Sequence, residues 1–299
     1  MQLSGIHLLL TYQCTFECDH CFVWGSPWQS GTMTIELINN ILDQAKEVDS
    51  IRWIYFEGGE PFLYYPVLVY GIRSAAKMGF NVGIVTNAYW ATSDNDARQW
   101  LEPLVGLIQD LSLSSDLYHY EEKISQQVRR AKDIAIQMGI PVGIISIAQP
   151  EEINALCAIG QLPEETSSVM YRGRAAERLV SRATLYPWEQ FTKCPHENLS
   201  EPGRVHVDSY GNLHICQGIS IGNLLRLPLK QICEHYDPLS HPIIRALIEN
   251  GPVGLIKSFY LPHEDSYADA CHLCYTARLN LRDRFPDLLL PHQMYGVKQ

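Results

Sequence analysis

Three closely spaced cysteines near the start of the chain have the types and spacing to do chemistry. Cys14, Cys18 and Cys21 form a C-x3-C-x2-C pattern. Thiolates this close can surround one iron–sulfur cube, which four cysteines normally hold. Three ligands leave one iron open to a small molecule, as in a catalytic zinc site; a zinc knuckle is the alternative. The next cysteine, Cys157, lies in an apolar stretch, and we expect it to be buried and inert.

A glycine-rich segment follows the second apolar run of the chain. It reads Glu57-Gly58-Gly59-Glu60-Pro61. Glycine lets the backbone approach a ligand closely and adopt dihedral angles that other residues avoid. A plain strand-to-helix turn is the alternative, because Gly-Gly and Glu-Pro are common in turns.

The cysteine pattern and this segment together resemble the signature of the radical S-adenosylmethionine (radical SAM) enzymes. His20 stands where that family usually has an aromatic residue before the last cysteine. The resemblance implies a [4Fe-4S] cluster whose open iron chelates the amino and carboxylate groups of SAM. It also implies that the Gly58–Pro61 segment holds the amino end of the SAM methionine. The reduced cluster would cleave SAM to methionine and a 5′-deoxyadenosyl radical, chemistry that belongs to the cofactor.

Polar residues after the later strands are further candidates, since the family commonly has such residues there. Asn87, Ser114 and Asp116 could hydrogen-bond the ribose and carboxylate of SAM, or could simply cap helices and turns. Arg174 lies in a segment that resembles the family's Gly-Arg-Ala element. It could bind a carboxylate of SAM or substrate through its fork, or be a surface residue. Asp116 and His119 are the catalytic candidates, because histidine can move a proton near neutral pH.

The C-terminal cysteines form a second set. Cys194, Cys216, Cys271 and Cys274 resemble the SPASM and twitch regions that hold auxiliary clusters in radical SAM enzymes. The chain has no cysteine after Cys274, which favours the shorter twitch form with one auxiliary [4Fe-4S] cluster. Four ligands close a cube, so this cluster would move electrons. Zinc is the alternative, and Cys233 could replace one of the four ligands.

Alternating apolar runs and helical patterns predict the elements that position these residues. Strands are expected at 6–11, 51–56, 81–86, 107–113, 142–147 and 167–170. Helices are expected at 34–48, with Thr34 as N-cap, and at 67–78, 94–101, 120–138 and 153–159. This rhythm predicts an α/β fold with parallel βαβ units. The resemblance implies a partial (β/α)6 TIM-like barrel, with its chemistry at the carboxyl ends of the strands.

The rhythm changes after Pro187. A β-hairpin is expected from residues 204–208 and 213–216, joined around Tyr210-Gly211-Asn212. We therefore expect a radical SAM barrel at 1–187, a twitch-type auxiliary-cluster region at 188–285 and a C-terminal tail at 286–299, packed on the body.

Composition restricts the partners. The 299-residue chain is 46% hydrophobic and 19% charged, as expected for a globular protein. Its formal charge of −10 argues against a nucleic-acid partner. The sequence has no long apolar run or signal peptide, so we expect neither a membrane span nor secretion, and a cytoplasmic location.

The resulting hypothesis is a radical SAM enzyme that oxidatively modifies a substrate after hydrogen abstraction. A peptide is favoured as substrate, with a crosslink or thioether as product, because maturases are numerous among relatives. Oxidation of a small molecule, such as a sugar alcohol or aminocyclitol, is the alternative. A flavodoxin- or ferredoxin-type protein would supply electrons. A zinc-stabilised binding protein is the non-enzyme alternative.

Overall fold

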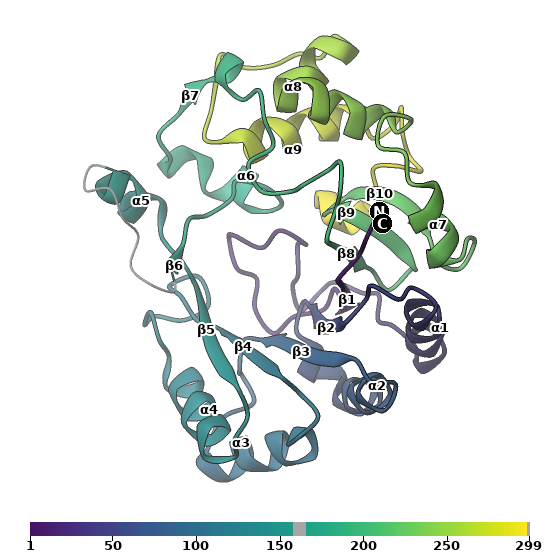
Figure 1. The fold of residues 1–299 in the computed structure, drawn as a ribbon. Helices are drawn as coiled ribbons and strands as arrows, with labels where there is room; N and C mark the ends of the chain where they lie inside the picture. Colours follow the sequence, from purple (N-terminus) through teal and green to yellow (C-terminus); the bar gives the residue numbers. More distant parts are fainter. Residues whose placement is uncertain (158–165, 298–299) are drawn as a thin grey trace.

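A long curved sheet forms the centre of the computed structural model, which describes residues 1–157 and 166–297 (Figure 1). Its first part alternates strands and helices in chain order. These elements are β1 (Gly5–Thr11), α1 (Ile35–Lys46), β2 (Trp53–Gly58), α2 (Tyr65–Lys77), β3 (Asn81–Thr86), α3 (Asp94–Leu101), β4 (Asp110–Ser114), α4 (Gln126–Gln137), β5 (Val142–Ile147), α5 (Pro150–Cys157) and β6 (Thr166–Ser167). Strands β1 to β6 pair in parallel in this order, which confirms the predicted partial barrel.

Alternation along the strands separates the two faces of this sheet. On β1, Ile6 and Leu8 are fully buried in one core with Ile38 and Ile41 of α1. Helices α1 to α4 lie on this outer side of the sheet (Figure 1). Thr34 caps α1 as predicted, since its hydroxyl accepts a hydrogen bond from the amide of Leu37.

Some predicted boundaries were wrong, for local reasons. Strand β4 begins at Asp110 instead of 107, because Gly106 adopts a positive φ and turns the chain first. Helix α4 begins at Gln126 instead of 120, because the carbonyl of Asp116 binds the amides of residues 119 and 120 in a turn. Strand β6 is Thr166–Ser167, so only Ser167 of the expected 167–170 lies in it. The expected helix at 153–159 is α5, although residues 158 and 159 and the side chain of Cys157 lie outside the described residues.

The C-terminal part extends the same sheet. It contains α6 (Ala175–Arg178), β7 (Tyr186–Pro187), β8 (Arg204–Val207), β9 (Asn212–Cys216), β10 (Ile219–Asn223), α7 (Leu229–His235), α8 (Pro242–Phe259), β11 (Ser266–Tyr267) and α9 (Ala270–Leu281). Strands β8 and β9 form the predicted hairpin, and β8 also pairs in parallel with β1. In the described part of the chain the sheet order is therefore β10-β9-β8-β1-β2-β3-β4-β5-β6.

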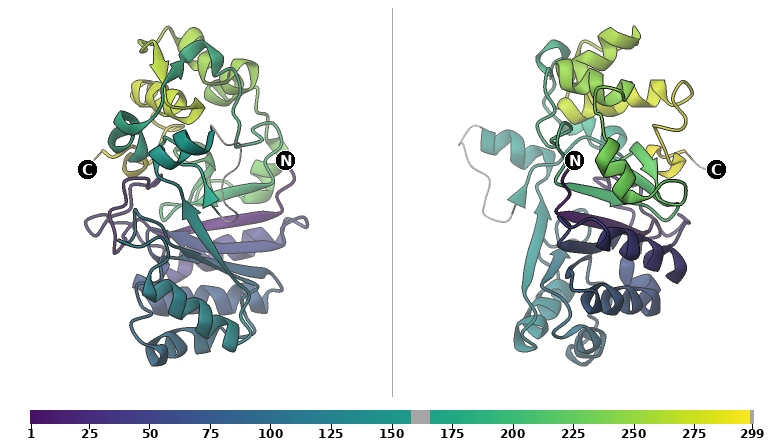
Figure 2. Two further views of the ribbon diagram at one scale, coloured as in Figure 1. Left: turned by 90° about the vertical axis from the view of Figure 1, so that its left-hand side faces the viewer. Right: turned by 45° about the vertical axis from the view of Figure 1, so that its right-hand side comes forward.

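Helices α8 and α9 were not predicted. They pack together on a second core with the end of β1. In both views of Figure 2, these yellow-green helices lie at the opposite end of the molecule from the blue helices of the barrel. The tail also packs here, because Met294 and Tyr295 are buried and the Tyr295 hydroxyl donates to the carbonyl of Gly218 at 2.7 Å. Two helical layers thus cover one shared sheet.

Candidate active site

The first three cysteines lie together on the loop after β1, beside a cavity of about 270 Å³. Cys14 and Cys18 are buried, and Cys21 is partly exposed. The amide of Gly25 donates to the sulfur of Cys21 at 3.1 Å. Burial raises the pKa of the Cys14 thiol to about 12, so a bound metal is what would hold this group as a thiolate. The donor set fits a cluster with three thiolate ligands.

Arg174 binds the backbone of the cysteine loop on the side away from the cavity. Its guanidinium is 2% exposed and donates to the carbonyls of Cys18 at 2.6 Å and Gly25 at 2.8 Å. Its own amide donates to the carbonyl of Cys21 at 3.0 Å. The guanidinium N–H groups therefore bind backbone oxygens of this loop. Arg174 does not line the cavity.

The glycine-rich segment passes directly against the start of the cysteine loop. The amide of Gly59 donates to the carbonyl of Thr11 at 2.7 Å, and that of Glu60 to the carbonyl of Gln13 at 2.8 Å. A Cβ atom on Gly59 would lie 2.1 Å from the Gln13 oxygen, so only glycine fits. Gly58 and Gly59 line the cavity.

Glu60 turns away from the cavity and joins β2 to the end of β3. Its carboxylate accepts hydrogen bonds from the Thr86 hydroxyl and from the amides of Phe62 and Asn87, at 2.8, 3.0 and 2.8 Å. Burial raises the pKa of Glu60 to about 7, although these hydrogen bonds stabilise the charged carboxylate and act to lower it. Pro61 is buried and begins a 3-10 helix behind the site. Glu60 and Pro61 therefore position the two glycines.

Most of the polar candidates at the strand ends line the cavity, and one lies behind it and supports the others. Asn87, Ser114 and His119 line the cavity. Asp116 lies behind them and is 2% exposed; its carboxylate contacts Nδ1 of His119 at 2.8 Å. Burial opposes its charge, but His119 and His20 hold the pKa of Asp116 below its usual value. Asp116 thus orients His119 toward the cavity.

His20 takes the place of the aromatic residue expected before the third cysteine. It lines the cavity, and its ring stacks on Tyr118 with centroids 4.6 Å apart. Burial lowers its pKa to about 4, so the imidazole is neutral near pH 7. A neutral stacked imidazole can replace an aromatic ring in this position.

The second set of cysteines surrounds its own narrow cavity. Cys194, Cys216, Cys271 and Cys274 all line it. Cys271 and Cys274 lie in the first turns of α9, while Cys216 ends β9. Cys233 packs in the barrel core, so the structure separates it from this set.

Two arginines accompany this second set, and sequence reasoning gave neither a role. Arg172 donates to the sulfur of Cys216 at 3.3 Å, and Arg278 is 1% exposed and lines the same cavity. Arg172 also lines the cavity of the first cysteines, so it lies in the wall between the two sites. The only sequence signal for a role of Arg172 was its position two residues before Arg174.

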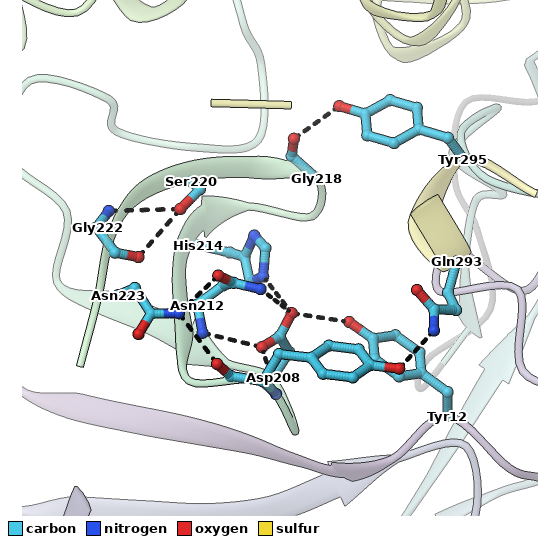
Figure 3. Close-up of polar contacts among 11 residues, drawn as sticks. Tyr12, Asp208, Asn212, His214, Gly218, Ser220, Gly222, Asn223, Gln293 and Tyr295 are labelled. Carbon is cyan, nitrogen blue, oxygen red and sulfur yellow. Dashed lines mark hydrogen bonds and ion pairs between the residues drawn. The ribbon is translucent and has the colours of Figure 1, made fainter. Parts of the chain in front are cut away.

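A buried polar cluster connects the hairpin that carries Cys216 to the start of the cysteine loop (Figure 3). Asp208 is fully buried and accepts hydrogen bonds from the Tyr12 hydroxyl at 3.3 Å and from the Asn212 side chain at 2.9 Å. Its carboxylate also contacts Nε2 of His214 at 3.1 Å. Because Tyr12 directly follows β1, this cluster fixes the two cysteine-bearing segments relative to each other.

Comparison with known proteins agrees with this geometry. Residues 8–151 match the radical SAM superfamily model. This segment is just under half of the chain. A match to this family implies a [4Fe-4S] cluster that binds SAM. Among curated proteins, YydG of Bacillus subtilis (strain 168), whose name gives it a provisional role in peptide biosynthesis, is 25% identical over 150 residues. The alignment covers 48% of this chain and 47% of YydG, so about half the length of that relative is matched.

Solved structures share the fold of most of the chain. SuiB of Streptococcus suis, bound to S-adenosylmethionine, superposes with a TM-score of 0.56 at 14% identity, over 85% of this chain and 74% of SuiB. BtrN, in complex with AdoMet and 2-DOIA, gives 0.53 at 17% identity, over 84% and 89%. These likenesses establish the α/β fold with its mostly parallel sheet. Among the described residues, no helix is both long and apolar enough to cross a bilayer.

Proposed function

We propose that this chain is a radical SAM oxidoreductase with two [4Fe-4S] clusters, which modifies its substrate by hydrogen abstraction followed by electron transfer. The first cluster would be held by Cys14, Cys18 and Cys21, and the auxiliary cluster by the four C-terminal cysteines. The observation that carries the proposal is the pair of cysteine-lined cavities that share Arg172 as a wall residue. We place the radical SAM barrel at 1–187, the auxiliary region at 188–285 and the tail at 286–299.

The residues at the first cavity divide into groups that bind and groups that support. When bound, the reduced cluster and SAM supply a 5′-deoxyadenosyl radical that removes a hydrogen atom from the substrate. Gly58 and Gly59 line the cavity, where their backbone would bind the amino end of SAM. Asn87 and Ser114 offer polar groups for its ribose and carboxylate. Glu60, Pro61 and Arg174 hold these elements in place.

His119 and Asp116 are proposed as the proton-handling pair. His119 faces the cavity, while its Nδ1 contacts Asp116 at 2.8 Å, which orients the ring. A substrate that loses a hydrogen atom, an electron and a proton is oxidised by two electrons. The auxiliary cluster, if bound by the four C-terminal cysteines, would supply an acceptor for this electron, and His119 would accept the proton.

A peptide is the substrate class we favour, with crosslink or thioether formation as the reaction. The similarity to YydG, with its provisional role in peptide biosynthesis, supports this choice. Dehydrogenation of a small molecule is the second candidate, and the fold shared with BtrN, solved with 2-DOIA, is compatible with it. We further propose a cytoplasmic location and a flavodoxin- or ferredoxin-type reductant.

The experiment that tests this function is metal analysis of anaerobically reconstituted protein. Iron, sulfide and zinc are measured in the wild type and in the Cys14, Cys18 and Cys21 triple alanine variant. Two cubes predict about eight irons per chain, and about four in the variant. The wild type must also release 5′-deoxyadenosine from SAM under reducing conditions. Zinc without iron would support the structural metal protein instead, and about four irons in the wild type would remove the auxiliary cluster.

A further inference from the structure

A further group of side chains that could hold a metal ion lies on the inner face of the barrel sheet. His7 of β1, Glu57 of β2 and His206 of β8 occupy three adjacent parallel strands. His7 pairs in register with both Tyr55 and His206, and Glu57 lies two residues beyond Tyr55. Since side chains alternate along a strand, all three point to the inner face of the sheet. Their ligand atoms lie within 4.8 Å of one another.

The distances in this group suit ligands that surround a common ion. Nδ1 of His7 lies 3.2 Å from Oε2 of Glu57, and Nε2 of His206 lies 3.1 Å from Oε1. Ligand atoms about 2.1 Å from a tetrahedral ion are separated by roughly 3.4 Å. The side chains of His7, Glu57 and His206 are only 16%, 12% and 7% exposed.

Unsatisfied polar atoms are the independent sign of a missing ligand. Oε1 of Glu57 contacts Nε2 of His206 at 3.1 Å but has no well-directed hydrogen bond among the described residues. Gln217 is 6% exposed, and its buried Oε1 is also unpaired. Its Nε2 lies 3.4 Å from Nε2 of His206. Exchanging the two near-isosteric ends of this amide would turn its oxygen toward the same centre.

We propose that His7, Glu57, His206 and the amide oxygen of Gln217 bind a divalent first-row transition ion, such as Zn²⁺ or Fe²⁺. Two imidazoles and one carboxylate are a donor set that these ions prefer. Glu57 also lines the cavity of the first cysteines, so the ion is reachable from that cavity. An oxygen or nitrogen donor of a substrate would then be a fifth ligand, an expansion that zinc sites allow. This inference does not depend on the auxiliary cluster or on the identity of the substrate.

Zinc binding to the reconstituted holoprotein tests the site. The protein is dialysed against Zn²⁺, and bound zinc is measured by mass spectrometry and X-ray absorption at the zinc edge. We expect one zinc per chain with nitrogen and oxygen neighbours. Glu57→Gln and His206→Gln should each weaken zinc binding at least about tenfold while the iron content stays unchanged.

A control variant makes the result decisive. Asp116→Asn removes the carboxylate of the second cluster of possible ligands, His20, Asp116 and His119, and should leave the zinc in place. Zinc with sulfur neighbours, zinc lost only in Asp116→Asn, or no zinc uptake by the wild type would overturn the proposal. The zinc-edge spectrum of the wild type decides the case even if a variant fails to fold.

Discussion

Replacing Arg172 by glutamine should make the auxiliary cluster harder to reduce. The Arg172 guanidinium donates to the sulfur of Cys216 at 3.3 Å, and it is buried between the two cavities. Burial disfavours its charge, but Cys216, Cys271 and Glu197 raise its pKa above the usual value, so it stays protonated. A fixed positive charge stabilises the reduced, more negative form of a cluster. Removing it therefore lowers the reduction potential.

The size of the change in reduction potential follows from the distance between the Arg172 guanidinium and the Cys216 sulfur. Coulomb's law with an effective dielectric constant of about 20 gives roughly 5 kcal/mol for unit charges 3.3 Å apart. An electron added to a cube is shared by its irons and sulfurs, so we take about one third of this value, ~1.7 kcal/mol. For one electron that corresponds to a potential lower by roughly 70 mV.

The measurement is a redox titration followed by electron paramagnetic resonance. It uses the Cys14, Cys18 and Cys21 triple alanine background, so that only the auxiliary cluster contributes. Arg172→Lys should recover part of the shift, because it restores the charge without the planar fork. Arg182→Gln, which removes a surface arginine paired with Glu151, should leave the potential unchanged. A potential that rises or does not move in Arg172→Gln would refute the electrostatic reasoning.

Three further predictions concern how the site is held. Asp208→Asn should cost about 3 kcal/mol of unfolding free energy near pH 7 by chemical denaturation, because buried donors lose a charged acceptor. His214 helps hold the pKa of Asp208 below its usual value despite burial, so this difference should shrink as the pH falls below about 4. Gly59→Ala should reduce iron at the first cluster by about half or more, since its Cβ meets the Gln13 carbonyl. Arg174→Gln should destabilise the protein by about 3 kcal/mol in denaturation and hasten iron loss in air, because two charged hydrogen bonds disappear.

The sequence was sufficient for the parts of the fold that follow periodicity. Strands β3 and β5 and helix α3 begin and end as predicted, because their apolar patterns stop at clear turn residues. The turn at 117–124 was missed, because its aromatic residues continue an apparently helical pattern while the carbonyl of Asp116 binds the amides of a local turn. Helices α8 and α9 were missed because they are buried on several sides and lack a clean apolar stripe.

The candidate site likewise contains parts that the sequence predicted and parts that it did not. Cysteine spacing alone indicated the loop of Cys14, Cys18 and Cys21, which are close in sequence, and the structure brings the three together beside one cavity. The cavity between the cysteines and Asn87, Ser114 and His119 follows from the strand order, which the rhythm of the chain predicted. The His7, Glu57 and His206 group was not predictable, because its members come from distant strands that meet only through the pairing of β1 with β8.

A three-residue segment joins the two cysteine sites mechanically. Arg174 holds the carbonyls of the first cysteine loop, while Arg172 contacts the sulfur of Cys216 in the second site. Gly173 between them has a φ of +60°, and a Cβ there would lie 2.6 Å from the carbonyl of Cys21. Any displacement of this segment therefore changes the surroundings of both sites at once. Because β8 also continues the barrel sheet, one backbone framework fixes both cysteine sites.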